Sequence, residues 1–243
     1  MGFGWPGKMN KPFNPDFAIK TNSLNVAPMY LVKTPQIIQN LLPHYTWKID
    51  TDEKVLHLTF DDGPIPEVTP WVLEQLARYD ASATFFCVGE NIKRNPSLLQ
   101  EIIDAGHAVG NHTYNHLNAW KTENRPYFLN VMRCAHLVHS RLFRPPYGKL
   151  LPRQAGFLKR HYRIIMWDVL SGDFDPLITE EQCLQNVLKN AGKGSIVVFH
   201  DSRKAWENLK FTLPRVLEHF ASKGYVFRNL DEALRSVEPL ELN

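Results

Sequence analysis

The sequence has few cysteines, no long apolar run and little excess of charge of one sign. Its three cysteines, Cys87, Cys134 and Cys183, are an odd number at wide spacings, which favours reduced thiols over a disulfide framework. No apolar run reaches the length of a membrane helix, so we expect no integral membrane segment. The net charge is only +3 and the basic residues are scattered, so we expect no nucleic-acid partner.

We also expect no secretory signal at the N-terminus, because no apolar core with a small-residue cleavage site occurs in MGFGWPGKMNKPFNPDFAIK. Residues 1–30 are rich in Asn, Pro, Lys and Gly without periodicity, and we expect a poorly ordered leader there. Met29, inside this segment, is an alternative start. Together with reduced thiols, these features favour a cytoplasmic location, and export by an unrecognised route is the alternative.

Residues 31–243 predict a single domain of the α/β class. Hydrophobic residues make up 44% of the chain, which is enough for a full core. Seven β-rich runs alternate with helical patterns, which indicates a mostly parallel sheet, either open or closed into a barrel. Gly106 and Gly192 are expected to end two of the helices. The β-rich runs span residues 55–60, 83–88, 107–112, 142–146, 163–169, 195–200 and 225–230.

Polar side chains stand where the β-rich runs end. In parallel α/β folds the chemistry gathers at the carboxyl ends of the strands, so these residues are expected to meet at one mouth of the sheet. They are Asp61 and Asp62, Asn111 and His112, Arg144, either Asp168 or Asp173, and His200 and Asp201.

The two adjacent aspartates of TFDDGP pose a geometric problem. Successive side chains of a strand point to opposite faces, so Asp61 and Asp62 serve one site only if the strand stops there. His112 and His116, spaced i and i+4 in HTYNH, would lie on one face of a helical turn, which suits two imidazoles on one metal. A carboxylate from the aspartate pair would complete a hydrolytic metal site with open positions.

Three further stretches carry candidate residues. In FRPPYGK, prolines hold Arg144 rigidly, which suits an arginine beside a carboxylate and a backbone N–H presented to an oxyanion. His200 ends a buried strand and is a candidate general acid, which Asp173 is placed to orient. Trp167 and Phe174, near Asp173, are either substrate-pocket residues or plain core.

The motifs TFDDGP, HTYNH, RPPYG, WDVLSGDF and VVFH, in this order and spacing, resemble those of the polysaccharide deacetylase family, the NodB-homology domain of carbohydrate esterase family 4. The resemblance covers about residues 55–230. It implies a distorted (β/α) barrel, here of about seven parallel strands. It also implies removal of acetyl groups from N-acetylglucosamine-containing glycans such as peptidoglycan or chitooligosaccharides. The implied cofactor is a divalent metal, usually zinc, with cobalt, manganese or nickel as alternatives.

The resemblance also assigns roles. It makes Asp61 the catalytic base, which Arg144 orients, and it makes Tyr147 the donor of a backbone N–H to the oxyanion. The metal ligands by resemblance are Asp62, His112 and His116. Asp173 would orient His200, the acid that protonates the leaving amine.

Two positions depart from the family pattern. Phe174 stands where the family usually has Trp, and Val198 stands where it usually has Leu. Because both positions help to line the acetyl pocket of the family, together with the neighbouring Trp167, we expect a slightly roomier pocket and a broader choice of acyl group.

Two other functions remain open. The same barrel can serve a metal-dependent amidase acting on a non-sugar amide or imide. A carbohydrate-binding relic without turnover is disfavoured because Asp61, Arg144 and His200 are all present and a binder would not need them.

Overall fold

The computed structural model describes Met1 and residues 30–237. The leader predicted over residues 1–30 therefore lies outside the described residues, except for its two ends. Within the described chain, no helix has both the length and the apolar character needed to cross a bilayer.

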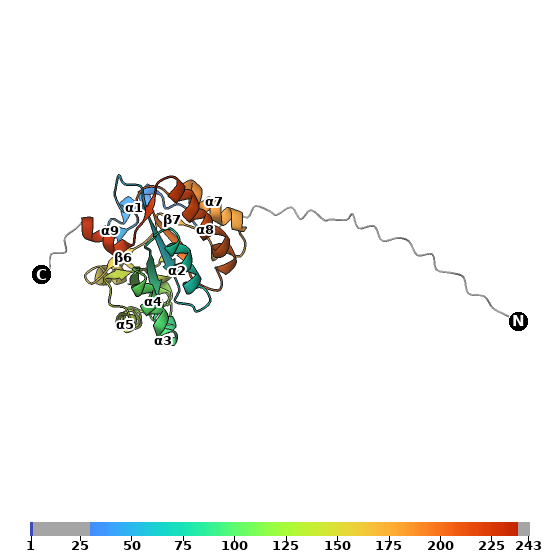
Figure 1. The fold of residues 1–243 in the computed structure, drawn as a ribbon. Coiled ribbons are helices and arrows are strands. Elements are labelled where there is room, and N and C mark those ends of the chain that lie inside the picture. The colour runs from blue at the N-terminus through green and yellow to red at the C-terminus, as the bar shows by residue number, and fades with distance from the viewer. Residues whose placement is uncertain (2–29, 238–243) are drawn as a thin grey trace.

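A single curved sheet forms the centre of the fold (Figure 1). Its order is β1-β6-β5-β4-β3-β2-β8-β7, and β9 pairs with β2 off this path. All these pairs are parallel, as predicted. The strands are β1 (Tyr45–Thr46), β2 (Val55–Asp61), β3 (Thr84–Cys87), β4 (Ala108–Asn111), β5 (Leu142–Phe143), β6 (Arg163–Ile165), β7 (Val169–Leu170), β8 (Ile196–His200) and β9 (Val226–Phe227).

The sheet curls into an incomplete barrel, which agrees with the predicted distorted barrel. β6 and β7 lie near opposite ends of the strand order, yet only residues 166–168 separate them in the chain. An extended linker of that length spans at most roughly 14 Å, so the two ends of the sheet must approach each other. The single strand predicted over residues 163–169 is therefore wrong: it is two strands. β1 was not predicted.

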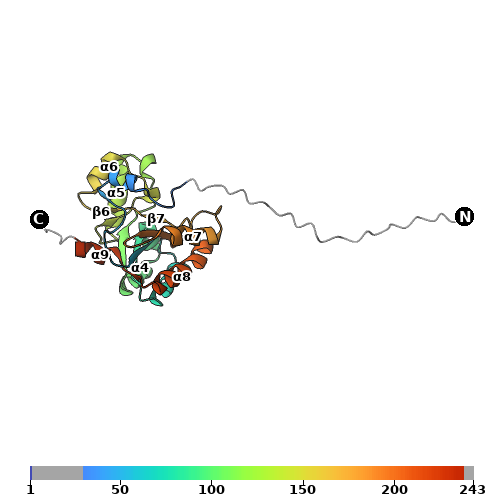
Figure 2. The ribbon, with the colours of Figure 1, turned by 90° about the horizontal axis from the view of Figure 1, so that it is seen from above.

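Helices cover the outside of the sheet. α5 and α6 lie together on one side, and α7 and α8 lie on another (Figure 2). The α-helices are α1 (Gln36–Leu41), α2 (Thr69–Ala77), α3 (Gly89–Arg94), α4 (Pro96–Asp104), α5 (Asn124–Ala135), α6 (Pro152–Leu158), α7 (Glu180–Asn190), α8 (Trp206–Ser222) and α9 (Leu230–Val237), with short 3₁₀ turns η1 (Ala119–Lys121) and η2 (Pro146–Gly148).

Alternation along the strands sorts side chains between the two faces of the sheet. Leu58 and Phe60 of β2 pack outward, in the core formed with the helices. Thr59 and Asp61 take the opposite face, because successive side chains alternate. The inner face closes at the amino end of the strands over a smaller apolar cluster, to which α9 contributes Leu230. The barrel interior is thus apolar at one end and polar at the carboxyl end of the strands.

The segment before α1 pairs with the free edge of β7. Lys33 and Val169 form an antiparallel bridge, and the Lys33 ammonium lies 2.6 Å from the Asp168 carboxylate. Asp168 is buried and also accepts a hydrogen bond from the Ser195 hydroxyl. Of the two aspartates left open by the sequence, Asp168 therefore anchors this edge of the sheet.

Glycines set two turns that matter for the barrel. Gly106 follows α4 with a φ of +82°, which confirms the predicted helix end. Gly192 also follows the end of α7, directly after the C-cap residue Ala191, but it does not have a positive φ. Gly194 holds the left-handed position instead, with a φ of +70°, in the turn that enters β8.

We predict that Gly194→Ala destabilises the protein while Gly192→Ala does not. A Cβ on Gly194 would lie 1.9 Å from the Ile49 carbonyl oxygen, whereas a Cβ on Gly192 would meet no heavy atom within 4 Å. The free energy of unfolding in urea should fall by at least about 2 kcal/mol for Gly194→Ala and change by less than about 0.5 kcal/mol for Gly192→Ala. Equal effects of the two substitutions would contradict this account of the turn.

Candidate active site

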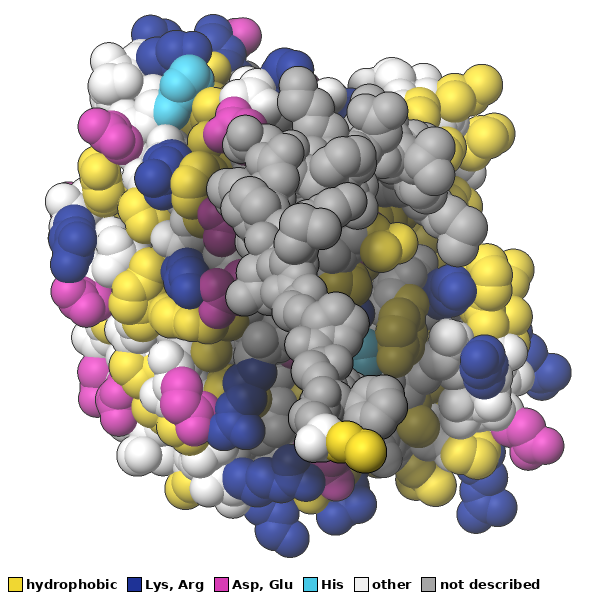
Figure 3. Space-filling model, turned by 90° about the vertical axis from the view of Figure 1, so that its right-hand side faces the viewer, with side chains coloured by type: hydrophobic (Ala, Val, Ile, Leu, Met, Phe, Trp, Pro, Cys, Tyr) yellow, Lys and Arg dark blue, Asp and Glu magenta, His cyan; other side chains and the backbone are white. Residues whose placement is uncertain are grey.

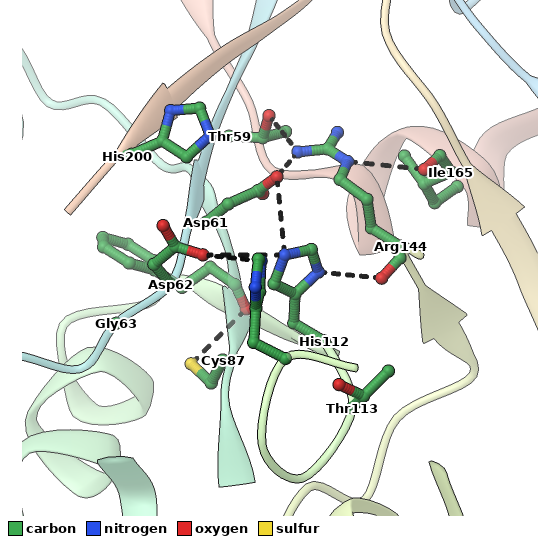
Figure 4. A network of polar contacts seen from close by, with 12 residues as sticks. Thr59, Asp61, Asp62, Gly63, Cys87, His112, Thr113, Arg144, Ile165 and His200 are labelled. Atoms are coloured by element: carbon green, nitrogen blue, oxygen red, sulfur yellow. Dashed lines mark hydrogen bonds and ion pairs between the residues drawn. The ribbon is translucent and has the colours of Figure 1, made fainter. Parts of the chain in front are cut away.

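Both carboxylates of the aspartate pair reach one site because the strand stops between them. β2 ends at Asp61, and Asp62 has a φ of +82° in the left-handed region. This turn aims the Asp62 carboxylate toward the same space that Asp61 faces (Figure 4). The Asn91 side-chain amide donates to the Asp62 carbonyl oxygen at 2.7 Å and helps to hold the turn. The expectation that the strand must end there is confirmed.

His112 and His116 meet through a loop rather than a helix. Residues 112–118 follow β4 without helical structure, so the helical explanation of their spacing is wrong. Thr113 and His116 both have positive φ values, +65° and +58°. The Asn111 side chain accepts from the Thr113 N–H at 2.9 Å and fixes the start of this loop. The result still places the two imidazole rings 5.1 Å apart, centroid to centroid.

Asp62, His112 and His116 form the one group of at least three possible metal ligands found in the described part of the chain. Asp62 Oδ1 lies 3.2 Å from His116 Nε2 and 3.8 Å from His112 Nε2. The ligand atoms of all three lie within 4.8 Å of one another. Two imidazole nitrogens and one carboxylate oxygen suit Zn²⁺ and leave coordination positions open, so the residues fit a divalent metal.

The surroundings keep His112 and Asp62 in ligating form. His112 Nδ1 lies 2.8 Å from the Arg144 carbonyl oxygen, to which it donates, so Nε2 keeps a free lone pair toward Asp62. Burial lowers the pKa of His112 to about 4, so its ring is neutral at neutral pH. Burial alone would raise the pKa of Asp62, but the hydrogen bond to His116 and the neighbouring histidines hold it well below its usual range.

Asp61 is paired with Arg144 inside the barrel. The guanidinium is fully buried and donates through Nη1 to Asp61 Oδ1 and to the Thr59 hydroxyl, each at 2.7 Å. Its other nitrogens donate to the carbonyl oxygens of Ile165 at 3.3 Å and Met166 at 3.0 Å. Asp61 Oδ2 is left 4.0 Å from His112 Nε2, at the edge of the ligand set. The Asp61 carboxylate is therefore fixed on one oxygen and faces the site with the other.

His200 approaches from the neighbouring strand. β8 pairs with β2 so that His200 stands opposite Asp61. Asp173 accepts from the His200 backbone N–H and from its Nδ1, both at 2.7 Å, so Asp173 rather than Asp168 contacts His200. Burial alone would lower the pKa of His200, but the Asp173 carboxylate, with Asp62 and Asp61, outweighs it and raises the pKa to about 9. The imidazole therefore carries a proton at neutral pH.

Tyr147 lies next to His116. Its φ of +61° and the φ of +64° at Gly148 turn the chain sharply after Arg144. Within the described residues the Tyr147 backbone N–H makes no hydrogen bond. The ring is exposed and lies 4.7 Å from the His116 ring, centroid to centroid. Trp167 packs closely on Gly148, where a Cβ would come within 2.5 Å of the indole.

Val198 lies on the same strand as His200, and Phe174 contacts the His200 ring. Val198 is buried on β8 two residues before His200, on the same face of the strand. The Phe174 ring meets the His200 ring at 5.1 Å and the Tyr30 ring at 5.2 Å, centroid to centroid. Tyr30 was not predicted to be near the site. The roomier acyl pocket stays a prediction; the contact of Tyr30 with Phe174 is an addition from the structure.

Other residues of the site had no predicted role. Thr59 and Asn91 hold the Arg144 side chain and the Asp62 backbone. Asp201 was expected at a strand end, but its contact with the Gly63 N–H was not foreseen. The only sequence signal for two of these three is position: Thr59 precedes Asp61 by two residues, and Asp201 follows His200 directly.

We predict that a divalent metal copurifies and that His112→Ala or His116→Ala loses it, because each removes one of three ligand atoms. Elemental analysis of the purified variants measures the metal. His107→Ala is the matched control, because His107 is also buried but its Nδ1 accepts from the Ala83 N–H instead. Full metal content in either ligand variant would disprove the assigned ligand set. Unfolding free energy should fall only modestly, since the barrel has its own apolar core.

Comparison with known proteins agrees with this geometry. Residues 48–161 match the family model described as polysaccharide deacetylase. A peptidoglycan-N-acetylglucosamine deacetylase of Bacillus cereus is 32% identical over 206 residues, which cover 79% of this chain and 93% of the relative. The crystal structure of a peptidoglycan N-acetylglucosamine deacetylase superposes with a TM-score of 0.72 at 29% identity, covering 78% of this chain and 92% of that one.

A less similar structure shows that a shared fold does not by itself establish catalytic activity. It is a carbohydrate esterase family 4 pseudoenzyme from Bacillus anthracis, with a TM-score of 0.66 at 26% identity, covering 77% of this chain and 68% of that chain. Fold and descent therefore do not establish turnover, which rests on the side chains of the site. On the match to the Bacillus cereus relative and the family model, this chain belongs to the polysaccharide deacetylase family.

Proposed function

We propose that this protein hydrolyses the N-acetyl group of N-acetylglucosamine residues in a glycan. One observation carries the proposal: a carboxylate fixed by Arg144 and an imidazole fixed by Asp173 both border a single set of metal ligands. Amide hydrolysis needs a base for the attacking water and an acid for the leaving nitrogen. Asp61 would supply the base, and His200 would supply the acid.

Asp62, His112 and His116 would hold the metal, for which we propose zinc. When bound, a divalent metal lowers the pKa of water and polarises the acetamide carbonyl. Cobalt, manganese and nickel are the alternatives, because they accept the same imidazole and carboxylate ligands. The buried position of His112 and its bond to the Arg144 carbonyl keep that ligand in one orientation.

Asp61 is the proposed base. Its Oδ1 is occupied by Arg144, which leaves Oδ2 to accept a proton from the attacking water. A rigid Arg144 also prevents the carboxylate from rotating away from the site, since the guanidinium is held by four acceptors. Orientation of this kind is a large part of the catalytic effect of a general base.

Tyr147 acts on the carbonyl oxygen of the acetamide, and His200 acts on its nitrogen. As the carbonyl oxygen gains negative charge, the free backbone N–H of Tyr147 donates a hydrogen bond to it. His200 Nε2 then gives its proton to the departing nitrogen, which leaves as an amine. The Asp173 carboxylate stabilises the protonated imidazole before this transfer, through the bond to Nδ1.

The substrate side of the proposal is a glycan carrying N-acetylglucosamine, which peptidoglycan and chitooligosaccharides share. On the face shown in Figure 3, side chains of both charges are interspersed, and a histidine lies recessed among hydrophobic side chains. The cytoplasmic location stays a prediction; Cys87, Cys134 and Cys183 are free and buried.

Acetate release tests the proposed function. The purified protein is assayed on chitooligosaccharides, peptidoglycan fragments, acetylxylan and small cyclic amides, with and without a chelator. We expect release from the first two, loss on chelation and recovery with Zn²⁺. Asp61→Asn should lower kcat/KM by roughly two to four orders of magnitude. Turnover of cyclic amides alone would favour the non-sugar amidase, and no turnover with full metal would favour a binding relic.

The pH dependence of kcat/KM tests the acid. Because the active form of His200 is protonated and its pKa is raised to about 9, activity should persist to about pH 9 and fall above it. Asp173→Asn removes the charge that raises this pKa, so the alkaline limb should move down by about 1–3 pH units. Asp175→Asn is the control, since Asp175 Oδ1 accepts from the Leu177 N–H instead. An alkaline limb that Asp173→Asn leaves in place would refute the role of His200.

A further inference from the structure

Asp201 touches both residues that flank the proposed metal ligand Asp62. Its own backbone N–H donates to the Asp61 carbonyl oxygen at 3.1 Å. Its Oδ1 accepts from the Gly63 N–H at 3.0 Å. The Asp201 carboxylate thus bonds to Gly63, which follows Asp62, and the Asp201 backbone bonds to Asp61, which precedes it. No other residue in the described part of the chain brackets Asp62 in this way.

The second carboxyl oxygen of Asp201 is tied to a helix. Oδ2 accepts from the Thr69 hydroxyl at 2.6 Å, and Thr69 is the first residue of α2. The same hydroxyl accepts from the Ile65 N–H at 2.8 Å. Asp201 and Thr69 are both buried, so these bonds are shielded from competing water. A continuous chain of hydrogen bonds therefore runs from the Gly63 amide to the start of α2.

Asp62 needs such support because of its backbone. A non-glycine residue with a φ of +82° is unfavourable unless its surroundings hold it there. The Asn91 side chain holds the Asp62 carbonyl, and the Val88 N–H donates to the Gly63 carbonyl at 2.9 Å. On the amide side of the turn, the Asp201 carboxylate accepts from the Gly63 N–H. The fit is close: a Cβ on Gly63 would come within 1.9 Å of Asp201 Oδ2.

Asp201 does not orient the neighbouring His200. Asp173 already accepts from both the backbone N–H and the ring Nδ1 of His200. The Asp201 carboxyl group is directed away from that imidazole, to Gly63 and Thr69. Its effect on the site therefore passes through the turn that carries Asp62.

We propose that Asp201 is a positioning residue that locks the Asp61–Gly63 turn and so presents the Asp62 carboxylate to the metal. The inference rests on the proposed role of Asp62 as a ligand. It adds a second layer to the site: Thr69 fixes Asp201, Asp201 fixes the turn, and the turn fixes the ligand. Residues that orient metal ligands in this way affect metal affinity without touching the metal.

Metal affinity of folded variants tests the proposal. Zn²⁺ affinity is measured by competition with a chromophoric chelator, and the geometry of the site by the visible spectrum of the Co²⁺ form. Asp201→Ala removes the acceptor of the Gly63 N–H and should weaken Zn²⁺ binding by about 10–100-fold. Thr69→Val removes the support of Asp201 and should weaken it by roughly tenfold. Both should alter the Co²⁺ spectrum.

Asp168→Ala is the matched control. Asp168 is as deeply buried as Asp201 and also accepts from a hydroxyl, that of Ser195, but it anchors Lys33 and does not contact the turn. The Asp168→Ala variant should be less stable than the wild type but should bind Zn²⁺ within about threefold of the wild-type affinity, because Asp168 does not contact the residues that hold Asp62. This separates a local effect on Asp62 from a general loss of stability.

Folded Asp201→Ala with the affinity and spectrum of the wild type would overturn the proposal. If circular dichroism shows that Asp201→Ala does not fold, Thr69→Val decides by the same criterion. Failure of the proposed function looks different: a wild type that binds metal but releases no acetate would refute the deacetylase and leave the affinity comparison intact.

Discussion

The buried pair of Arg144 and Asp61 organises the polar end of the barrel. The guanidinium has no exposed surface, so each of its donors needs a partner inside the protein. It finds them on β2 and at the end of β6, which are separated by three strands in the sheet order. Removing one partner of such a pair leaves an uncompensated charge and costs about 3–5 kcal/mol. Arg144 thereby crosslinks the interior while it fixes the proposed base, and its carbonyl orients the proposed ligand His112.

The division of work between adjacent aspartates follows from one change of backbone conformation. Asp61 completes β2 and stays on the inner face of the sheet, where Arg144 holds it. Asp62 enters the left-handed region and turns its carboxylate to His116. The register of β8 against β2 then places His200 beside the pair. The proposed base, metal ligand and acid are positioned by three different constraints, so each should respond to its own substitutions.

The strand-end residues were predictable from sequence because parallel strands place their carboxyl ends at one mouth. The family, the barrel and the contact of Asp173 with His200 followed from the motifs. The helical interpretation of the spacing of His112 and His116 was wrong, because the loop has positive φ values at Thr113 and His116 and is held by tertiary hydrogen bonds that spacing does not encode. The Gly89 N–H donates to the Thr113 carbonyl, and the Tyr114 N–H donates to the Asn130 side chain. The packing of Tyr30 on Phe174 escaped prediction for the same reason: it depends on the segment before α1 pairing with β7.

The central claim is that Asp62 holds the metal and Asp61 moves the proton. Zn²⁺ binding isotherms of Asp61→Asn and Asp62→Asn, measured on the metal-free proteins, test it most directly. The account predicts that Asp61→Asn binds Zn²⁺ within about tenfold of the wild type, because it only adjoins the ligand set, whereas Asp62→Asn loses far more affinity with its charged ligand. Retention of tight binding by Asp62→Asn, with loss in Asp61→Asn, would contradict the account and exchange the two roles.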